Sequence, residues 1–312
     1  MSVEVKRGKF LSADGKTDIQ YKEWRNSEKA PKAILQIAHG MAEYIERYDD
    51  FAKFMVKNGF VVFGNDHLGH GDTAKTEEDL GFFADKNGYK LLAQDVHTLT
   101  GIAKKEYDRL PIILLGHSMG SFVARLYASK YSSDIDGAIF MGTSGSNPVG
   151  GIGIFIVNLI SLFKGEHHRS PFIDKLAFGS YNKSFTDAKT PFDWLSTERS
   201  NVTKYINDDK CGYLFTLSGY RDLMKILGAV SKKDWAEKIR KDLPVLLISG
   251  SEDPVGGLTK GVSEVYDKLK NAGIEKLDLK FVDGKRHEIL NEDNKAETYD
   301  FVLNWCKAAV GI

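Results

Sequence analysis

The segment Gly116-His117-Ser118-Met119-Gly120 places a serine between two glycines, a pattern typical of nucleophilic serines. The apolar run 112–115 precedes this segment, and residues 121–130 follow it with helical spacing. A serine on such a strand-to-helix turn exposes its hydroxyl above the carboxyl ends of the strands, and the glycines avoid clashes in the sharp turn. We therefore predict that Ser118 is a nucleophile. The alternative is a glycine-rich turn in which the serine only caps the helix.

A serine hydroxyl needs an adjacent base to accept its proton. Of the eight histidines, His287 is the best candidate, because it lies in the loop after Lys280-Phe281-Val282, the last strand candidate of the chain, and this kind of sheet places functional groups in such loops. A carboxylate should in turn orient the imidazole. Asp253 follows the strong apolar run 244–248 and is the carboxylate that we favour. Glu252 and Asp283 compete for this role, although each is more simply a turn or surface residue.

The remaining histidines have simpler interpretations. His67 and His70 could suggest a metal pair, but their loop offers no convincing third ligand, so we predict a structural turn and no metal. His117 is adjacent to Ser118 and is expected to pack beside the pocket or to line it. A serine mechanism of this kind requires no organic cofactor.

These residues must be positioned by alternating short apolar runs and helical segments. The apolar runs have the composition of buried parallel strands, and the alternation predicts an α/β fold with right-handed crossovers. The predicted strands are 32–38, 61–65, 111–115, 137–141 and 244–248, and the predicted helices are 48–58, 89–107, 121–130, 257–271 and 293–309. Residues 3–11 and 18–24 alternate more and predict a hairpin at the edge of the sheet.

Strand-like apolar runs are absent between residues 146 and 243, where the pattern of apolar residues is helical. We predict that 146–243 is a mainly helical cap inserted into a core made of 1–145 and 244–312. The alternative is a helical layer that only completes the core. The run 152–163 favours the cap, because it is apolar on nearly every face, more than one core contact would use.

Composition excludes several other classes of protein. The 312 residues include 43 basic and 43 acidic side chains, and this zero net charge argues against a nucleic-acid partner. The two cysteines, Cys211 and Cys306, exclude a disulfide framework. The N-terminus lacks a signal-peptide pattern and the longest apolar stretch, 150–163, is too short for a membrane span, so we expect a cytoplasmic protein. Nothing in the sequence indicates its oligomeric state.

The order Ser118, Asp253, His287 and the motifs around these residues resemble those of the monoacylglycerol lipase and lysophospholipase-like hydrolases, also called the serine aminopeptidase family. The matching motifs cover essentially the whole chain and lie at 39–44, 66–71, 116–120, 250–253 and 286–288. The resemblance implies the α/β-hydrolase fold, with a mostly parallel eight-stranded sheet, helices on both faces and a helical cap insertion. It also implies that the backbone N–H groups of Met41 and Met119 form the oxyanion hole, although relatives often carry a smaller residue where Met41 stands.

The predicted activity is hydrolysis of carboxylic esters with an apolar acyl chain, through an acyl-enzyme. The expected partner is a small-molecule ester or lipid, with His117, Phe155, Ile156 and Val255 as expected substrate-binding residues. The apolar cap helix, with Phe155 and Ile156, could line an acyl tunnel, touch a membrane or micelle, or simply pack in the interior.

Two other functions remain open at this point. The same triad cleaves amides, and a peptidase of free N-termini would need acidic groups in the cap, for which Glu166, Asp187 and Glu198 are candidates. A hydrolase-fold binding protein without catalysis is the more remote alternative.

Overall fold

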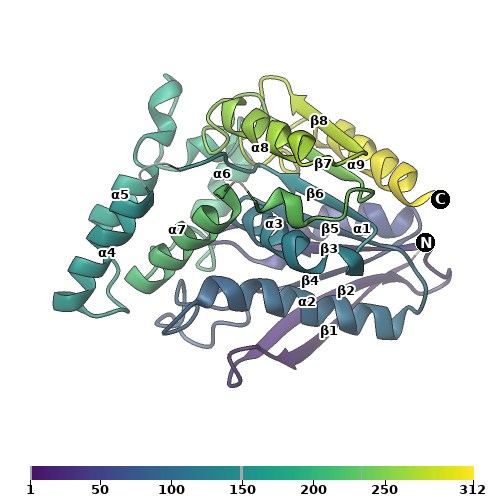
Figure 1. Cartoon of the computed structure of the whole chain (residues 1–312), viewed down its shortest axis with the longest axis horizontal. Helices are drawn as coiled ribbons and strands as arrows, with labels where there is room; N and C mark the ends of the chain where they lie inside the picture. Colours follow the sequence, from purple (N-terminus) through teal and green to yellow (C-terminus); the bar gives the residue numbers. More distant parts are fainter. Residues whose placement is uncertain (1, 148–149, 233) are drawn as a thin grey trace.

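A computed structural model describes residues 2–147, 150–232 and 234–312 and shows one eight-stranded sheet (Figure 1). The strand order is β1-β2-β4-β3-β5-β6-β7-β8. Strands β3 to β8 run parallel, whereas β2 is antiparallel to both β1 and β4. The strands are β1 (Val3–Leu11), β2 (Asp18–Asn26), β3 (Ala33–Ala38), β4 (Phe60–Asn65), β5 (Ile112–His117), β6 (Gly137–Met141), β7 (Val245–Gly250) and β8 (Leu277–Val282).

Helices cover both faces of the sheet, as the sequence predicts. Helices α1 (Asp49–Lys57) and α9 (Lys295–Val310) pack on one face, and α2 (Gly88–Glu106), α3 (Met119–Tyr131) and α8 (Lys260–Asn271) pack on the other. Successive side chains of β5 point to opposite faces of the sheet and join two different hydrophobic cores. Both sets of side chains are therefore apolar. Ile112 and Leu114 join the core under α2 and α3, while Ile113 and Leu115 join the core under α1 and α9.

Residues 146–243, called the cap below, lie between β6 and β7 in the chain. Their helices are α4 (Gly150–Lys164), α5 (Pro171–Phe178), α6 (Arg199–Ile206) and α7 (Leu217–Ser231). In Figure 1 the helices α4, α5 and α7 stand at the end of the molecule opposite the two termini. Within the described part of the cap, the β-pairing consists of a single bridge between Arg169 and Thr216. Residues 148–149 and 233 of the predicted cap lie outside the described residues.

Helix α4 is a surface helix, although its sequence is apolar almost throughout. Its buried residues are Gly153 and Val157. Gly153 allows α4 to approach α7 closely, because a Cβ there would lie 2.8 Å from the sulfur of Met224. The opposite side carries large apolar side chains into solvent, with Leu162 80% and Phe163 81% exposed.

A buried arginine joins the cap to the helix that follows Ser118. Arg125 of α3 donates hydrogen bonds to Thr143 Oγ1 (3.2 Å) and Ser144 O (2.8 Å), just before the cap begins. It also donates to Val230 O (2.6 Å), near the end of α7. Its guanidinium lies 4.4 Å from the ring of Trp235. One side chain therefore contacts the segment that leads into the cap and two residues within the cap.

Among the described residues, no helix is both long and apolar enough to cross a lipid bilayer.

Candidate active site

Ser118 occupies the turn between β5 and α3 in a strained backbone conformation. Its φ of 53° lies in the left-handed region, which is unusual for a residue with a side chain. The neighbouring glycines are required by close packing, since a Cβ on Gly116 would lie 2.2 Å from Gly120 O and a Cβ on Gly120 would lie 2.0 Å from Ala38 O. Although Ser118 is the N-cap of α3, its hydroxyl makes no capping hydrogen bond. The helix-capping alternative therefore does not describe this serine.

His287 and Asp253 are brought together by the loops after β8 and β7. The Nδ1 atom of His287 lies 2.9 Å from Asp253 Oδ2, and both side chains are buried. Asp253 also accepts hydrogen bonds from Ser249 Oγ (3.0 Å) and from the backbone N–H of Val255 (2.9 Å). Burial alone would raise the pKa of Asp253, but its electrostatic interaction and hydrogen bond with His287, together with the hydrogen bonds from Val255 and Ser249, outweigh burial and lower that pKa. The competing carboxylates do not take this position: Asp283 is exposed and contacts Ser251.

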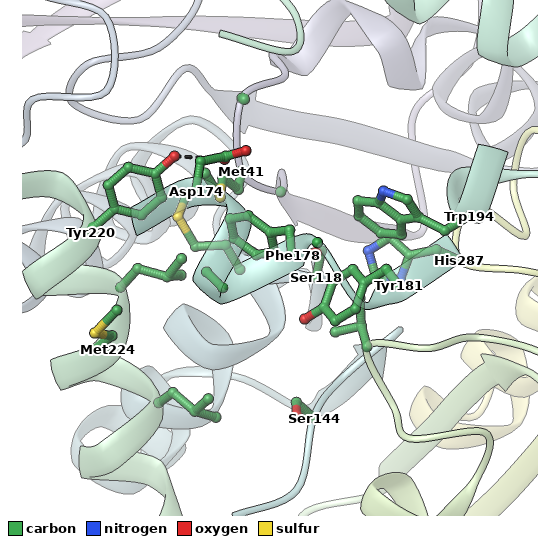
Figure 2. A pocket seen from close by; sticks show the side chains of 18 of the residues that line it. Met41, Ser118, Ser144, Asp174, Phe178, Tyr181, Trp194, Tyr220, Met224 and His287 are labelled. Carbon is green, nitrogen blue, oxygen red and sulfur yellow. Dashed lines mark hydrogen bonds between the residues drawn. The ribbon is translucent and has the colours of Figure 1, made fainter. Parts of the chain in front are cut away.

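The other nitrogen of His287 is available for proton transfer. With Nδ1–H donated to Asp253, Nε2 is an acceptor, and it is buried without a hydrogen-bond partner in the described part of the chain. His287 and Ser118 line the same cavity, of about 710 Å³ (Figure 2). The ring of Trp194 lies 5.2 Å from that of His287 and covers it from the cap side.

The loop after β3 lies against Ser118. Gly40 is in close contact with the serine, because a Cβ at Gly40 would lie 3.1 Å from Ser118 Cβ. Met41 lines the cavity, and the next residue, Ala42, has a left-handed φ of 48°. The N–H of Ala42 donates to His70 Nε2 (3.3 Å), and its carbonyl accepts from Tyr205 Oη and from the N–H of Gly212, each at 3.0 Å.

Three buried histidines pack against the loop after β3 and form hydrogen bonds in and around it. His39 Nε2 accepts the N–H of His67 (3.0 Å) and its Nδ1 lies 2.8 Å from Gly40 O. Burial lowers the pKa values of His39, His67 and His70, that of His70 to about 3. No group of three or more metal-ligating side chains occurs within the described residues. The histidines therefore act as neutral hydrogen-bonding groups of the turn.

His117 lies in a buried polar network beside Ser118. Its Nε2 is 3.2 Å from His287 O, and its Nδ1 is 2.9 Å from Tyr48 Oη and 3.3 Å from Glu43 Oε1. Glu43 also accepts the N–H of Gly40 at 2.6 Å. Burial alone would raise the pKa of Glu43, but the hydrogen bond to His117 and the nearby positive charges hold it well below its ordinary value.

Arg47 extends this network to the residue after His287. Its guanidinium lies 2.7 Å from Glu43 and binds both carboxylate oxygens of Glu288, at 2.6 and 2.8 Å. Buried charged side chains thus join three parts of the site: the loop that carries Gly40, His117 next to Ser118, and the loop that carries His287. Sequence reasoning missed this network, although Glu43 and Glu288 lie within the motifs that it singled out.

Of the residues expected to bind substrate, three line the cavity and one does not. His117, Ile156 and Val255 are lining residues. Phe155 is 67% exposed and is not a lining residue of the cavity, so a role in substrate binding stays a prediction for this residue. Consecutive residues of a helix point about 100° apart, and Ile156 faces inward while Phe155 faces solvent. Met41 is also a lining residue, so its long side chain occupies space that a smaller residue would leave open.

The acidic cap residues considered for binding an amine lie elsewhere. Glu166 pairs with Arg221, and Asp187 is 2.8 Å from Arg286. Glu198 caps helix α6 by accepting the N–H of Ser200. None of the three lines the cavity. Asp174 of α5 does, and it was not among the sequence candidates because nothing in the sequence marks which face of α5 points inward.

Comparison with known proteins identifies the family. A sequence profile described as "Serine aminopeptidase, S33" matches residues 29–294. The monoglyceride lipase of Rattus norvegicus is 25% identical over 288 residues, covering 91% of this chain and 84% of that protein. A monoacylglycerol lipase of Mycolicibacterium smegmatis is 26% identical over 294 residues, covering 93% of each chain.

The structure agrees with the sequence comparison. The crystal structure of a highly thermostable carboxyl esterase from Bacillus coagulans, in complex with glycerol, matches with a TM-score of 0.91 at 30% identity. The match covers 98% of this chain and 99% of that chain. Together with the turn at Ser118 and the matched motifs, these findings confirm the α/β-hydrolase fold and show that the chain belongs to the serine aminopeptidase S33 family.

Proposed function

We propose that this protein is a serine hydrolase that cleaves carboxylic esters with an apolar acyl chain. One observation carries the proposal: Ser118, with no capping bond, shares a cavity with His287, whose Nδ1 is hydrogen-bonded to buried Asp253. The names of the relatives, monoglyceride lipases and a carboxyl esterase, favour esters over amides as substrates.

The proposed reaction has two halves. Ser118 Oγ attacks the ester carbonyl while His287 Nε2 takes its proton, and the Asp253 carboxylate stabilises the resulting imidazolium. The N–H groups of Met41 and Met119 receive the oxyanion, each contributing about 3 kcal/mol to the transition state. The alcohol leaves with the proton from His287. Water then attacks the acyl-enzyme with His287 again as base, which releases the acid and restores Ser118.

An apolar acyl chain suits the walls of the cavity. Helices α4 and α7 contribute apolar lining residues on one side, namely Ile152, Ile156, Leu223, Met224 and Leu227. A chain that leaves water for this surface gains about 0.8 kcal/mol for each buried methylene.

Replacement of Ser118 by alanine tests the proposal. We expect Ser118→Ala to lower kcat for p-nitrophenyl butyrate by at least about 10⁴-fold, because the covalent route is lost. A fluorophosphonate probe should label the parent protein and not this variant. Ser129→Ala is the matched control, since Ser129 lies on the same helix and donates only to Leu126 O. Full turnover by Ser118→Ala would overturn the assignment.

We also propose that the cap is an inserted domain whose exposed apolar face meets a lipid surface. The exposed residues are Ile152, Phe155, Leu159, Leu162 and Phe163 of α4, and Phe172 and Leu176 of α5, defined here as the apolar face. Ile152 and Leu176 also line the cavity, so the apolar face continues into it. Exposed apolar surface of this kind is typical of membrane or partner contact. The zero net charge offers no overall attraction, so apolar burial would supply the affinity.

A further inference from the structure

One carboxylate in the cavity has no cation to neutralise it. The acidic lining residues are Glu43, Glu288 and Asp174. Glu43 and Glu288 both pair with Arg47, at 2.7 and 2.6 Å. No ion pair within the described residues includes Asp174. Glu43 and Glu288 share the single charge of Arg47, and Glu43 also contacts His117 at 3.3 Å. Asp174, in the first turn of α5, is the described lining carboxylate that has no ion-pair partner.

Asp174 is held in place by a tyrosine of the neighbouring helix. The Tyr220 hydroxyl on α7 donates a hydrogen bond of 2.7 Å to Asp174 Oδ1 (Figure 2), and Tyr220 is fully buried. Arg169 lies near enough for its charge to lower the pKa of Tyr220 against the stronger upward effect of burial. The N–H groups of Arg169 are, however, donated to backbone carbonyls of Leu214 and Glu77. The Asp174 carboxylate thus keeps acceptor capacity toward the cavity.

Aromatic rings connect this carboxylate with the proposed catalytic histidine. Starting from Trp194, which contacts His287, the ring centroids of Trp194 and Tyr181 are 4.9 Å apart. Tyr181 and Phe178 are 5.6 Å apart, and Phe178 and Tyr220 are 6.4 Å apart. These four residues all line the cavity. Aromatic rings attract cations where their faces are open to the cavity, whereas the ring of Tyr220 is fully buried and Tyr220 contributes its hydroxyl to Asp174.

We propose that Asp174, positioned by Tyr220, is a subsite for an ammonium group carried by the ester substrate. The inference rests on the proposed function, because the ester bond of the same molecule would lie at Ser118. A neutral hydroxyl could hydrogen-bond to the half-buried Asp174 but would leave its charge without an ion-pair partner. An ammonium group supplies both the hydrogen bond and the opposite charge, and charge-assisted hydrogen bonds are the stronger class.

Inhibition of p-nitrophenyl butyrate hydrolysis measures this preference directly. The probes are n-alkylammonium ions and the 1-alkanols of equal chain length. We expect each ammonium ion to bind about 10-fold more tightly than its alkanol, a ratio that corresponds to about 1.4 kcal/mol. In Asp174→Asn the ratio of the two inhibition constants should fall to about 1. In Tyr220→Phe, which keeps the charge of Asp174 but loses the hydrogen bond that positions it, the ratio should be intermediate.

Glu166→Gln is the matched control, because it removes a cap carboxylate that pairs with Arg221 and lies outside the cavity. It should keep the ratio of the parent protein. Equal inhibition constants in the parent protein, or a ratio unchanged in both Asp174→Asn and Tyr220→Phe, would overturn the subsite. Absence of p-nitrophenyl butyrate hydrolysis in the parent protein would instead overturn the proposed function, so the two failures are distinguishable.

A pair of substrate comparisons identifies which half of the ester carries the charge. 2-(Dimethylamino)ethyl butyrate, which carries an N–H when protonated, against 3-methylbutyl butyrate tests an ammonium group on the alcohol. The p-nitrophenyl esters of 6-aminohexanoate and heptanoate test one on the acyl chain. A preference for the charged member of either pair that disappears in Asp174→Asn supports the subsite, and the absence of a preference in both pairs contradicts it.

Discussion

The hydroxyl of Tyr205, on cap helix α6, donates a hydrogen bond of 3.0 Å to the carbonyl oxygen of Ala42, the residue after Met41. The N–H of Gly212, also in the cap, donates to the same oxygen. Ala42 has a left-handed φ of 48°, a conformation that costs about 1–2 kcal/mol for a residue with a side chain. The cap thus helps to hold the strained loop on which the proposed oxyanion donor depends.

Removal of the Tyr205 hydroxyl should therefore impair turnover more than binding. We expect Tyr205→Phe to lower kcat for p-nitrophenyl butyrate about 5- to 10-fold with a smaller change in KM, since a lost hydrogen bond of about 1 kcal/mol would loosen the oxyanion donor. Steady-state kinetics provide the measurement. Tyr127→Phe is the matched control, because Tyr127 is buried, donates to Thr100 Oγ1 and lies outside the cavity. Equal effects of the two variants would show that the contact with Ala42 has no special role.

The pH dependence of stability should reveal the buried neutral state of His70. Burial, with the nearby His39, lowers its pKa to about 3, whereas the unfolded value is about 6.5. Between these values the unfolded chain binds a proton that the folded protein does not. The stability contributed by His70 is therefore complete above about pH 6.5 and is lost as the pH falls toward 3.

His70→Gln isolates this effect, because glutamine can still accept the N–H of Ala42 but does not titrate. Urea unfolding of both proteins at pH 7, 6 and 5 gives the difference in the free energy of unfolding. That difference should narrow with falling pH by up to about 1.4 kcal/mol per unit. Asp95, whose pKa burial raises to about 6, acts in the opposite direction but is common to both proteins. A difference that stays constant from pH 7 to 5 would contradict the prediction.

Glu43→Gln should lower stability by an amount that depends on pH. The variant loses charge-assisted hydrogen bonds from Arg47 and Tyr48, and we expect a loss of about 2 kcal/mol in the free energy of unfolding near pH 6. Burial alone would lower the pKa of His117, but its contact with Glu43 raises it overall. The stability due to this shift is complete below about pH 6.5 and is lost as the pH rises through the folded value.

The loss in the free energy of unfolding caused by Glu43→Gln should therefore be smaller at pH 9 than at pH 6. Denaturant unfolding at the two pH values measures it. Asp234→Asn provides the comparison, because it breaks an exposed, solvent-screened pair with Lys238 and should change the free energy of unfolding much less than Glu43→Gln does. A penalty as small as that of Asp234→Asn at both pH values would disprove a structural role for the buried network.

The apolar face of the cap predicts binding to lipid vesicles. The double variant Leu162→Ser with Phe163→Ser should reduce co-sedimentation with phosphatidylcholine vesicles at least about 10-fold, since each side chain contributes about 1.5–3 kcal/mol when removed from water. Leu11→Ser is the matched control, because Leu11 is also exposed, at 58%, but lies on strand β1. Undiminished sedimentation of the double variant would exclude this face as the contact.

The fold was largely predictable, because strands such as 111–115 and 137–141 differ sharply in composition from the segments between them. The turn at Ser118 was predictable for a similar reason, since its glycines and the flanking elements are neighbours in the sequence. Selection of Asp253 over Glu252 and Asp283 as the partner of His287 followed from its place after a strong strand, and the structure brings Asp253 to the imidazole.

Contacts between distant parts of the chain were not predictable. Arg47 and Glu288 are 241 positions apart, and Tyr220 and Asp174 are 46 positions apart in separate cap helices. The apolar sequence of α4 showed no dominant face, so the inward position of Ile156 and the outward position of Phe155 depend on how Gly153 packs against α7. Which side of such a helix points inward is decided by tertiary packing, and the apolar pattern of the sequence does not show it.

The contacts of Arg125 bear on how this cap can be recombined with other cores. Because one guanidinium binds Thr143 and Ser144 just before the cap and Val230 within it, the cap is not a freely exchangeable module. A chimaera that grafts a relative's cap at residues 146–243 would retain Arg125 but replace the carbonyl at Val230 and the ring of Trp235. Successful grafts should be those whose donor caps present an equivalent carbonyl and aromatic ring to Arg125, which gives a simple criterion for choosing donors.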